Sequence, residues 1–150
     1  MRNVLVTGGA GFIGSNFIHY LLNTEPDVNI VNLDALTYAG NLDNLQGLPE
    51  AARYTFVQGD INDFKLVSGL LHTHQIDCVV HFAAETHVDR SILGPAQFIQ
   101  TNVMGTFNLL EAARQYWLDE QALPGIDKRL HHVSSDEVYG SLGLDEPAFT

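Results

Sequence analysis

Short apolar runs alternate with longer amphipathic segments along this chain. The apolar runs have the length of buried strands. They are NVLVTG, NIVNLD, YTFVQGD, DCVVHFAAE and LHHVSS, at residues 3–8, 29–34, 54–60, 77–85 and 130–135. Between them, apolar residues at helical spacing predict helices over residues 12–23, 63–75 and 94–117. The alternation predicts a βαβ series and therefore a parallel sheet.

The longest predicted helix shows which residues should enter the core. Pro95 suits a first helical position, and Phe98, Phe107 and Leu110 follow at core spacings. Apolar strands imply helices on both faces of the sheet, right-handed crossovers and a ligand site at the carboxyl ends of the strands. The predicted fold class is thus α/β, a Rossmann-like doubly wound parallel sheet. Residues 37–54 are less regular and predict a loop with a short helix.

Length and charge narrow the class of partner. A chain of 150 residues predicts one domain over residues 1–150, and a formal net charge of −11 argues against binding to nucleic acid or an anionic membrane. One cysteine, Cys78, excludes an internal disulfide, and the first apolar run is too short for a signal peptide. We expect a cytoplasmic protein. Most of the seven histidines lack ligand-like spacing, so no metal site is expected.

The first predicted strand runs directly into TGGAGFIG and then a helix. Gly8, Gly11 and Gly14 would allow a tight turn, close approach of the backbone to a pyrophosphate, and close packing of helix on sheet. The motif reads as GxxGxxG or, from Gly9, as GxGxxG. A simple strand-to-helix turn is the alternative, but the strand before and the helix after favour dinucleotide binding.

Asp34 ends the second predicted strand, twenty residues beyond Gly14. A carboxylate there can accept hydrogen bonds from both adenosine ribose hydroxyls and would repel a 2′-phosphate. No arginine lies between Asp34 and Arg53, which favours NAD over NADP. The alternative is a loop carboxylate that caps a turn. Asp60, after the third strand, could hold the adenine edge or equally cap a turn or helix.

Two adjacent carboxylates follow the last predicted strand in VSSDEVYG. Asp136 and Glu137 would cost free energy if they were buried without partners. Close carboxylates disfavour double ionisation, so one can stay protonated while the other acts as a base. Strand alternation would point them to opposite faces, so both can reach one substrate only if the strand ends here. From the residues alone, an acid–base pair and a helix cap remain open.

Five motifs in the same order carry a resemblance over nearly the whole chain: TGGAGFIG, LTYAGNL, HFAAETHVDRSI, TNVMGT and SSDEVYG. Together they resemble the N-terminal half of the dTDP-glucose 4,6-dehydratases, in the extended short-chain dehydrogenase/reductase family. The resemblance implies that Thr86 and Ser135 contact the sugar. It also implies an NAD site lined by Phe12, Ile13, Asp34, Ala35, Leu36, Thr37, Asp60, Ile61, Phe82, Ala83, Ala84, Glu85, Thr86 and Thr101.

The resembled enzymes oxidise the glucose of dTDP-glucose at C4, eliminate water across C5 and C6, and return the hydride to C6. The resemblance makes Glu137 the base for the C5 proton and Asp136 the acid for the leaving hydroxyl. Ser135 would hydrogen-bond the C4 hydroxyl, where the family usually has threonine. The complete enzyme is expected to be a homodimer in which the long helix pairs with a helix absent here. An apolar stripe along residues 95–117 should therefore be exposed.

Some family features are absent from these residues. Family members carry a Tyr-x-x-x-Lys pair, whereas Lys65 and Lys128 have no tyrosine four residues earlier. The chain also stops before the expected substrate domain, so we expect a fragment that is inactive alone. Two alternatives remain open. One is a nucleotide-sugar 4-epimerase or decarboxylase, which has no need of adjacent acids after Ser135, and the other is a non-catalytic NAD-binding module.

Overall fold

The computed structural model describes residues 2–49, 51–120, 128–140, 142, 143 and 147. In these ranges the strands form one parallel sheet in the order β3-β2-β1-β4-β5. The strands are β1 (Arg2–Thr7), β2 (Val28–Asp34), β3 (Tyr54–Gln58), β4 (Cys78–His81) and β5 (Arg129–His132). The predicted α/β class, with a Rossmann-like parallel sheet, is confirmed.

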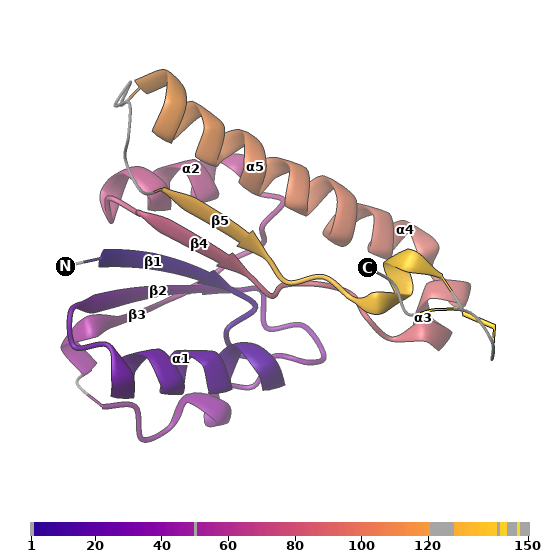
Figure 1. The fold of residues 1–150 in the computed structure, drawn as a ribbon, viewed down its shortest axis with the longest axis horizontal. Coiled ribbons are helices and arrows are strands. Elements are labelled where there is room, and N and C mark those ends of the chain that lie inside the picture. Colours follow the sequence, from indigo (N-terminus) through magenta and orange to yellow (C-terminus); the bar gives the residue numbers. More distant parts are fainter. Residues whose placement is uncertain (1, 50, 121–127, 141, 144–146, 148–150) are drawn as a thin grey trace.

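Helices cover both faces of this sheet (Figure 1). Helix α1 (Phe12–Thr24) lies on one face, and α2 (Phe64–Thr73) and α5 (Thr106–Arg114) lie on the other. The long predicted helix is continuous, because α4 (Pro95–Phe98), π-helical η3 (Ile99–Gly105), α5 and π-helical η4 (Gln115–Glu120) follow without a gap. The shorter elements are η1 (Leu42–Leu45), η2 (Ala51–Arg53), α3 (Val88–Leu93) and η5 (Asp136–Tyr139).

The fourth strand is shorter than the sequence pattern predicts. The apolar run suggests a strand over residues 77–85, whereas β4 ends at His81. The Phe82 N–H still donates to the Thr7 carbonyl at 3.0 Å. Further along, the Glu85 N–H donates to the side chain of Asn102 at 2.8 Å. At this point the long helix, and no longer strand β1, is the hydrogen-bond partner of the segment. Helix α3, which the pattern does not predict, follows.

Two apolar cores lie against the two faces of the sheet. On β1, Val4 and Val6 point to the α1 side and Leu5 points to the opposite side, as the two-residue repeat of a strand requires. Ile18 of α1 belongs to the first core, and Val67 of α2 belongs to the second. Burial of both faces explains why central strands such as β1 contain consecutive apolar residues.

The long helix buries a different face from the predicted one. Phe107 and Leu110 are 55% and 50% exposed, and Phe98 is only partly buried. The buried residues are instead Leu109, Ala112, Ala113 and Tyr116. The helix carries apolar residues on two faces, and the small alanines let it pack closely on the sheet and α2.

A neighbouring face of this helix forms an exposed apolar stripe, which we define as Ile99, Val103, Phe107 and Leu110. Its exposure confirms the expectation from the sequence. Residues three or four apart lie on one side of a helix, so these four side chains are neighbours on the surface. No helix in the described ranges is both long and apolar enough to span a membrane. A contiguous apolar patch of this kind favours protein association.

We therefore expect the chain to associate through the apolar stripe. Replacing Phe107 and Leu110 together by glutamate should shift the mass measured by light scattering towards the 16.5 kDa of one chain, because two charges would have to be desolvated in the interface. Tyr20→Glu, at a 62% exposed position on α1, is the control and should leave association unchanged. A parent chain that stays monomeric at high concentration and binds no apolar dye would contradict the expectation.

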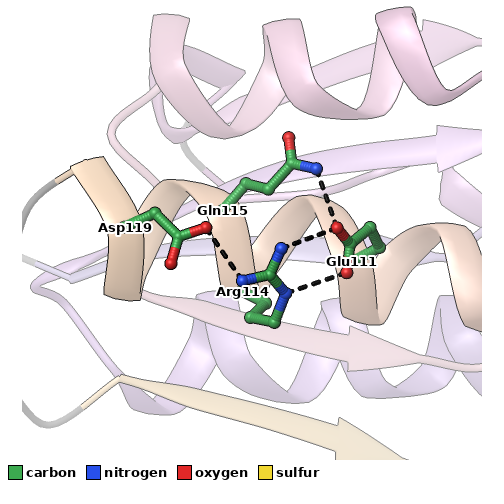
Figure 2. Close-up of polar contacts among 4 residues, drawn as sticks. All are labelled: Glu111, Arg114, Gln115 and Asp119. Carbon is green, nitrogen blue, oxygen red and sulfur yellow. Dashed lines mark hydrogen bonds and ion pairs between the residues drawn. The ribbon is translucent and has the colours of Figure 1, made fainter.

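Beside the apolar stripe, the end of the long helix carries a charged cluster, shown in Figure 2. Arg114 donates to both carboxylate oxygens of Glu111, at 2.9 and 2.7 Å, and to Asp119 at 2.8 Å. Gln115 also donates to Glu111. The hydrogen bonds from Arg114 lower the pKa of Glu111 to about 2. Because the cluster is exposed to solvent, its contribution to stability is small.

Candidate functional site

The candidate site lies at the carboxyl edge of the sheet, where β1 and β4 are neighbours. After β1 the chain continues to β2 on one side of this point, and after β4 it continues to β5 on the other side, so the direction of winding reverses between β1 and β4. In doubly wound sheets this switch point is where ligands bind. Figure 1 shows that the segments after β1, β4 and β5 all leave the sheet at the same end.

The glycine loop and the loop after β4 touch each other at this point. Gly8 has a positive φ of 72°, and a Cβ atom on it would lie 2.6 Å from the backbone nitrogen of Ala83. A Cβ atom on Gly14 would lie 2.3 Å from the Gly8 carbonyl oxygen. Both positions therefore require glycine. Gly8 needs it for its positive φ and for its close contact with Ala83, and Gly14 needs it for its close contact with Gly8 alone.

The start of α1 is open for an anion. The Gly9 N–H donates to the side chain of Asn32 at 3.1 Å, and the Ala10 N–H donates to the side chain of Asp34 at 2.8 Å. These two amides therefore fix the glycine loop to the end of β2. Within the described residues no side chain caps α1, and Phe12 and Ile13 of its first turn are 81% and 62% exposed. An uncapped helix start of this kind can bind phosphate.

Asp34 is 8% exposed and holds two backbone segments. Its Oδ2 accepts the Ala10 N–H, and its Oδ1 accepts the Leu36 N–H, each at 2.8 Å. Leu36 adopts a positive φ of 52° in this turn. The carboxylate therefore caps a turn and also anchors the glycine loop. Each oxygen keeps a second lone pair for another donor, so the predicted contact with ribose hydroxyls is compatible with this role and stays a prediction.

Asn32 is a site residue that the sequence reasoning missed. It is fully buried on β2, where its Oδ1 accepts the Gly9 N–H and its Nδ2 donates to the Tyr54 hydroxyl at 2.9 Å. Burial raises the pKa of the Tyr54 hydroxyl. The signal was an amide inside the apolar run NIVNLD, because a buried polar side chain implies a specific partner.

The loop after β4 contributes residues 82–86 to the candidate site. The ring of Phe82 packs on Phe17 of α1 with centroids 5.2 Å apart. Glu85 is buried and is held through its backbone by Asn102, whereas Ala84 and Thr86 are exposed. The structure thus brings this predicted loop against the glycine loop.

The segment after β3 lies against the long helix. Asp60 Oδ1 accepts from the backbone and side chain of Asn62 at 2.8 and 2.9 Å, which is the turn role considered above. Ile61 is buried, and a Cβ atom on Gly105 would lie 2.4 Å from its Cδ1. Thr101 accepts a hydrogen bond from Gln97 at 3.3 Å. Cofactor contacts by Asp60, Ile61 and Thr101 stay predictions.

Around the β2 side, Ala35 and Thr37 are exposed in the turn that Asp34 holds. The next residue, Tyr38, lies under the guanidinium of Arg90, which is 4.1 Å from the ring centroid. This cation–π contact joins the turn after β2 to helix α3. The segments after β2 and β4 are therefore linked at the candidate site.

The predicted catalytic segment begins after β5, which pairs with β4 so that His132 lies opposite His81. Strand β5 ends at His132, and the short helix η5 begins at Asp136, so strand alternation does not separate Asp136 from Glu137. Ser135 is exposed. The side chains of Asp136 and Glu137 lie outside the described part of the structure, so their roles stay predictions.

Behind these loops, His81 is 1% exposed at the end of β4. Burial, with a smaller effect from His132, lowers the pKa of His81 to about 4, from 6.5 for an exposed imidazole. The folded protein therefore holds this side chain neutral. The unfolded chain binds more protons at this group between the two pKa values, which makes stability depend on pH.

We expect the free energy of unfolding to fall as the pH drops from 6.5 towards 4, with about 3 kcal/mol attributable to His81. Denaturant unfolding at a series of pH values measures it. His81→Asn should flatten the profile in this window, whereas His131→Asn, at an exposed position on β5, should not. Equal slopes for the parent and His81→Asn would contradict the assignment.

The sheet order, the glycine loop at the switch point and the acidic residue at the end of β2 define a Rossmann-like domain. Residues 5–150 match the family described as GDP-mannose 4,6 dehydratase. The chain belongs to this family.

Within this family, the chain is similar to several dTDP-glucose 4,6-dehydratases. The chain is 49% identical over 150 residues to a dTDP-glucose 4,6-dehydratase of Haemophilus influenzae, covering 100% of this chain and 44% of the relative. The Bacillus anthracis dTDP-glucose 4,6-dehydratase in complex with NAD superposes with a TM-score of 0.82 at 41% identity, over 100% of this chain and 42% of that one. The Streptomyces venezuelae enzyme, also with NAD, gives 0.82 at 47% identity, over 99% and 43%.

The chain thus matches the N-terminal portion of dTDP-glucose 4,6-dehydratases and spans less than half the length of the curated relatives. The resemblance noted in the sequence motifs is confirmed.

Proposed function

We propose that residues 1–150 are the NAD-binding portion, itself incomplete, of a dTDP-glucose 4,6-dehydratase. The observation that carries the proposal is the position of SSDEVYG. The motif follows β5, directly beside β4, whose following loop touches the glycine loop. Chemistry placed after β5 would therefore lie next to the candidate cofactor site. A 4-epimerase has no need of adjacent acids there, and a non-catalytic module has no need of the motif at all.

The residues fit NAD. Gly8 and Gly14 keep the cradle free of side chains, and the uncapped start of α1 can hold the pyrophosphate. Asp34 would accept from the ribose hydroxyls with its remaining lone pairs. When bound, NAD supplies the acceptor for the C4 hydride and later returns that hydride to C6.

The side chains after β5 would perform the proton transfers of the elimination, whereas the C4 hydroxyl proton would go to the tyrosine of the Tyr-x-x-x-Lys pair, which these residues do not contain. Ser135 orients the C4 hydroxyl, Glu137 removes the C5 proton, and Asp136 protonates the C6 hydroxyl as it leaves. Two neighbouring carboxylates disfavour double ionisation, which suits one acid and one base. Thr86 follows β4, the strand next to β5, and is exposed towards solvent, so it is available for the sugar.

A chimera tests the proposal. This chain would replace the matching segment of the Haemophilus influenzae relative, which supplies the remainder of the enzyme. Supplied with NAD and dTDP-glucose, the chimera should form the 4-keto-6-deoxy sugar. The relative without replacement is the positive control, and the 150-residue chain alone should form no product. A folded, NAD-binding chimera that forms no product, or forms only a 4-epimer, would contradict the proposal.

We further expect this chain to bind NAD at least about tenfold more tightly than NADP, since a 2′-phosphate would face the Asp34 carboxylate. Calorimetric titration with both cofactors measures the preference. Asp34→Asn removes the charge and one of the two backbone hydrogen bonds, from Ala10 or Leu36. The lost hydrogen bond affects both cofactors alike, so the NAD-to-NADP ratio reports the charge and should narrow, whereas Asp43→Asn, an exposed carboxylate in η1, should leave the ratio unchanged. Equal affinities in the parent would contradict the role of Asp34.

A further inference from the structure

A continuous chain of hydrogen bonds runs behind the candidate cofactor site, through residues that the proposed reaction does not use. His81 is at its centre. Its Nδ1 lies 2.7 Å from the Thr7 Oγ1, and its Nε2 lies 3.0 Å from the Thr106 Oγ1. Thr7 ends β1, His81 ends β4, and Thr106 begins α5. Three elements that are far apart in the sequence are thus joined by one buried side chain.

The positions of the protons follow from counting donors. The Thr106 hydroxyl has one proton, and it donates that proton to the Asn102 carbonyl at 2.8 Å. Thr106 must therefore accept from His81, so the imidazole carries its proton on Nε2. Nδ1 is then an acceptor, and the Thr7 hydroxyl donates to it. Thr7 in turn accepts the Ala83 N–H at 3.4 Å.

Both ends of this chain reach loops of the candidate site. Thr7 directly precedes Gly8, whose Cα is packed against the Ala83 backbone. At the other end, Asn102 holds Glu85 through two bonds, since its Oδ1 accepts the Glu85 N–H and its Nδ2 donates to the Glu85 carbonyl, each at 2.8 Å. The network therefore sets the glycine loop and the loop after β4 at a fixed separation.

We propose that His81 is a positioning residue for the candidate cofactor site, where its neutral Nε2–H form holds the end of β1, the loop over residues 83–85 and the long helix together. The inference rests on the proposed NAD binding. A protonated imidazole would present a donor to Thr7 where an acceptor is required, so the role needs the neutral form. Burial favours this neutral form. The titratable ring packed on His81 is that of His132 on β5, with the two ring centroids 4.9 Å apart.

Two measurements on the 150-residue chain test the proposal. Nitrogen NMR of the imidazole groups near pH 7 should show His81 as the neutral Nε2–H tautomer. NAD titration should show at least about tenfold weaker binding for Thr106→Val, which removes the hydroxyl at constant shape. Thr106→Ser returns the hydroxyl and should restore the affinity. His131→Asn, on β5 but outside the network, is the control.

The outcomes separate the possible failures. An Nδ1–H or a protonated His81 would overturn the proposal even if the variants do not fold. A folded Thr106→Val that binds NAD as the parent does would overturn it too. Loss of binding in Thr106→Val without restoration in Thr106→Ser would also overturn it, because the hydroxyl would then not be the required group. A folded parent that shows the expected tautomer but binds no NAD would contradict the proposed function itself.

Discussion

Replacing Glu137 by glutamine and Asp136 by asparagine should stop water elimination in the chimera with the Haemophilus influenzae relative while leaving C4 oxidation possible. The order of the steps gives the reason. The C5 proton becomes acidic only after C4 has become a ketone, so loss of the acid and the base acts after the cofactor has been reduced. We expect formation of the 4-keto-6-deoxy sugar to fall by at least about 100-fold, the range for loss of general acid–base catalysis.

Single-turnover absorbance and solvent deuterium exchange at C5 measure the effect. The doubly substituted chimera should accumulate reduced cofactor and incorporate no deuterium. Ser135→Ala should instead slow the appearance of reduced cofactor, because its hydroxyl serves the earlier step. Glu111→Gln, at a partly exposed position on α5, controls for the loss of a carboxylate elsewhere. Product formation near the parent rate by the double variant would show that SSDEVYG only ends a strand.

Gly8→Ala should destabilise the fold by about 4 kcal/mol and abolish NAD binding. Two causes add at this position. An L-residue at a φ of 72° costs about 1 kcal/mol, and the new methyl group would lie 2.6 Å from the Ala83 backbone nitrogen. Backbone cannot rotate away as a flexible side chain can, so the loop after β4 would have to move from the glycine loop.

Gly47→Ala separates the two causes. Gly47 has nearly the same φ, 74°, but a Cβ atom there would meet nothing within 4 Å. We expect a loss of only about 1 kcal/mol, with NAD binding retained. Denaturant unfolding and NAD titration of both variants give the comparison. Similar losses for the two would show that backbone conformation, and not contact with Ala83, sets the requirement for glycine at position 8.

The succession of strands and helices along the chain, the glycine loop and the acidic residue at the end of β2 could all be predicted from the sequence. Each is encoded locally, because a strand or helix repeat relates residues within a few positions of one another. The sequence also predicted that TGGAGFIG and Asp34 belong to one site. A short βαβ unit has few possible geometries, so the end of its second strand must lie near the loop after its first strand. The resemblance of five ordered motifs added the enzyme class.

Only the tertiary structure decided which groups meet. Periodicity marked Phe107 and Leu110 as core, but contact with the sheet and α2 buries Leu109 and Ala112 instead. The apolar run at residues 77–85 also gave no sign that β4 ends at His81. Beyond the strand, the backbone of Glu85 bonds to Asn102 of the long helix, which is distant in the sequence.

The same limit applies to Asn32 and His81. A buried polar side chain is stable only with partners, and these partners are the glycine loop for Asn32, and Thr7 and Thr106 for His81. Sequence alone determined that such residues needed partners. Which partners they have depends on contacts between segments up to 74 residues apart, such as Thr7 with His81, and those contacts form only when the sheet assembles.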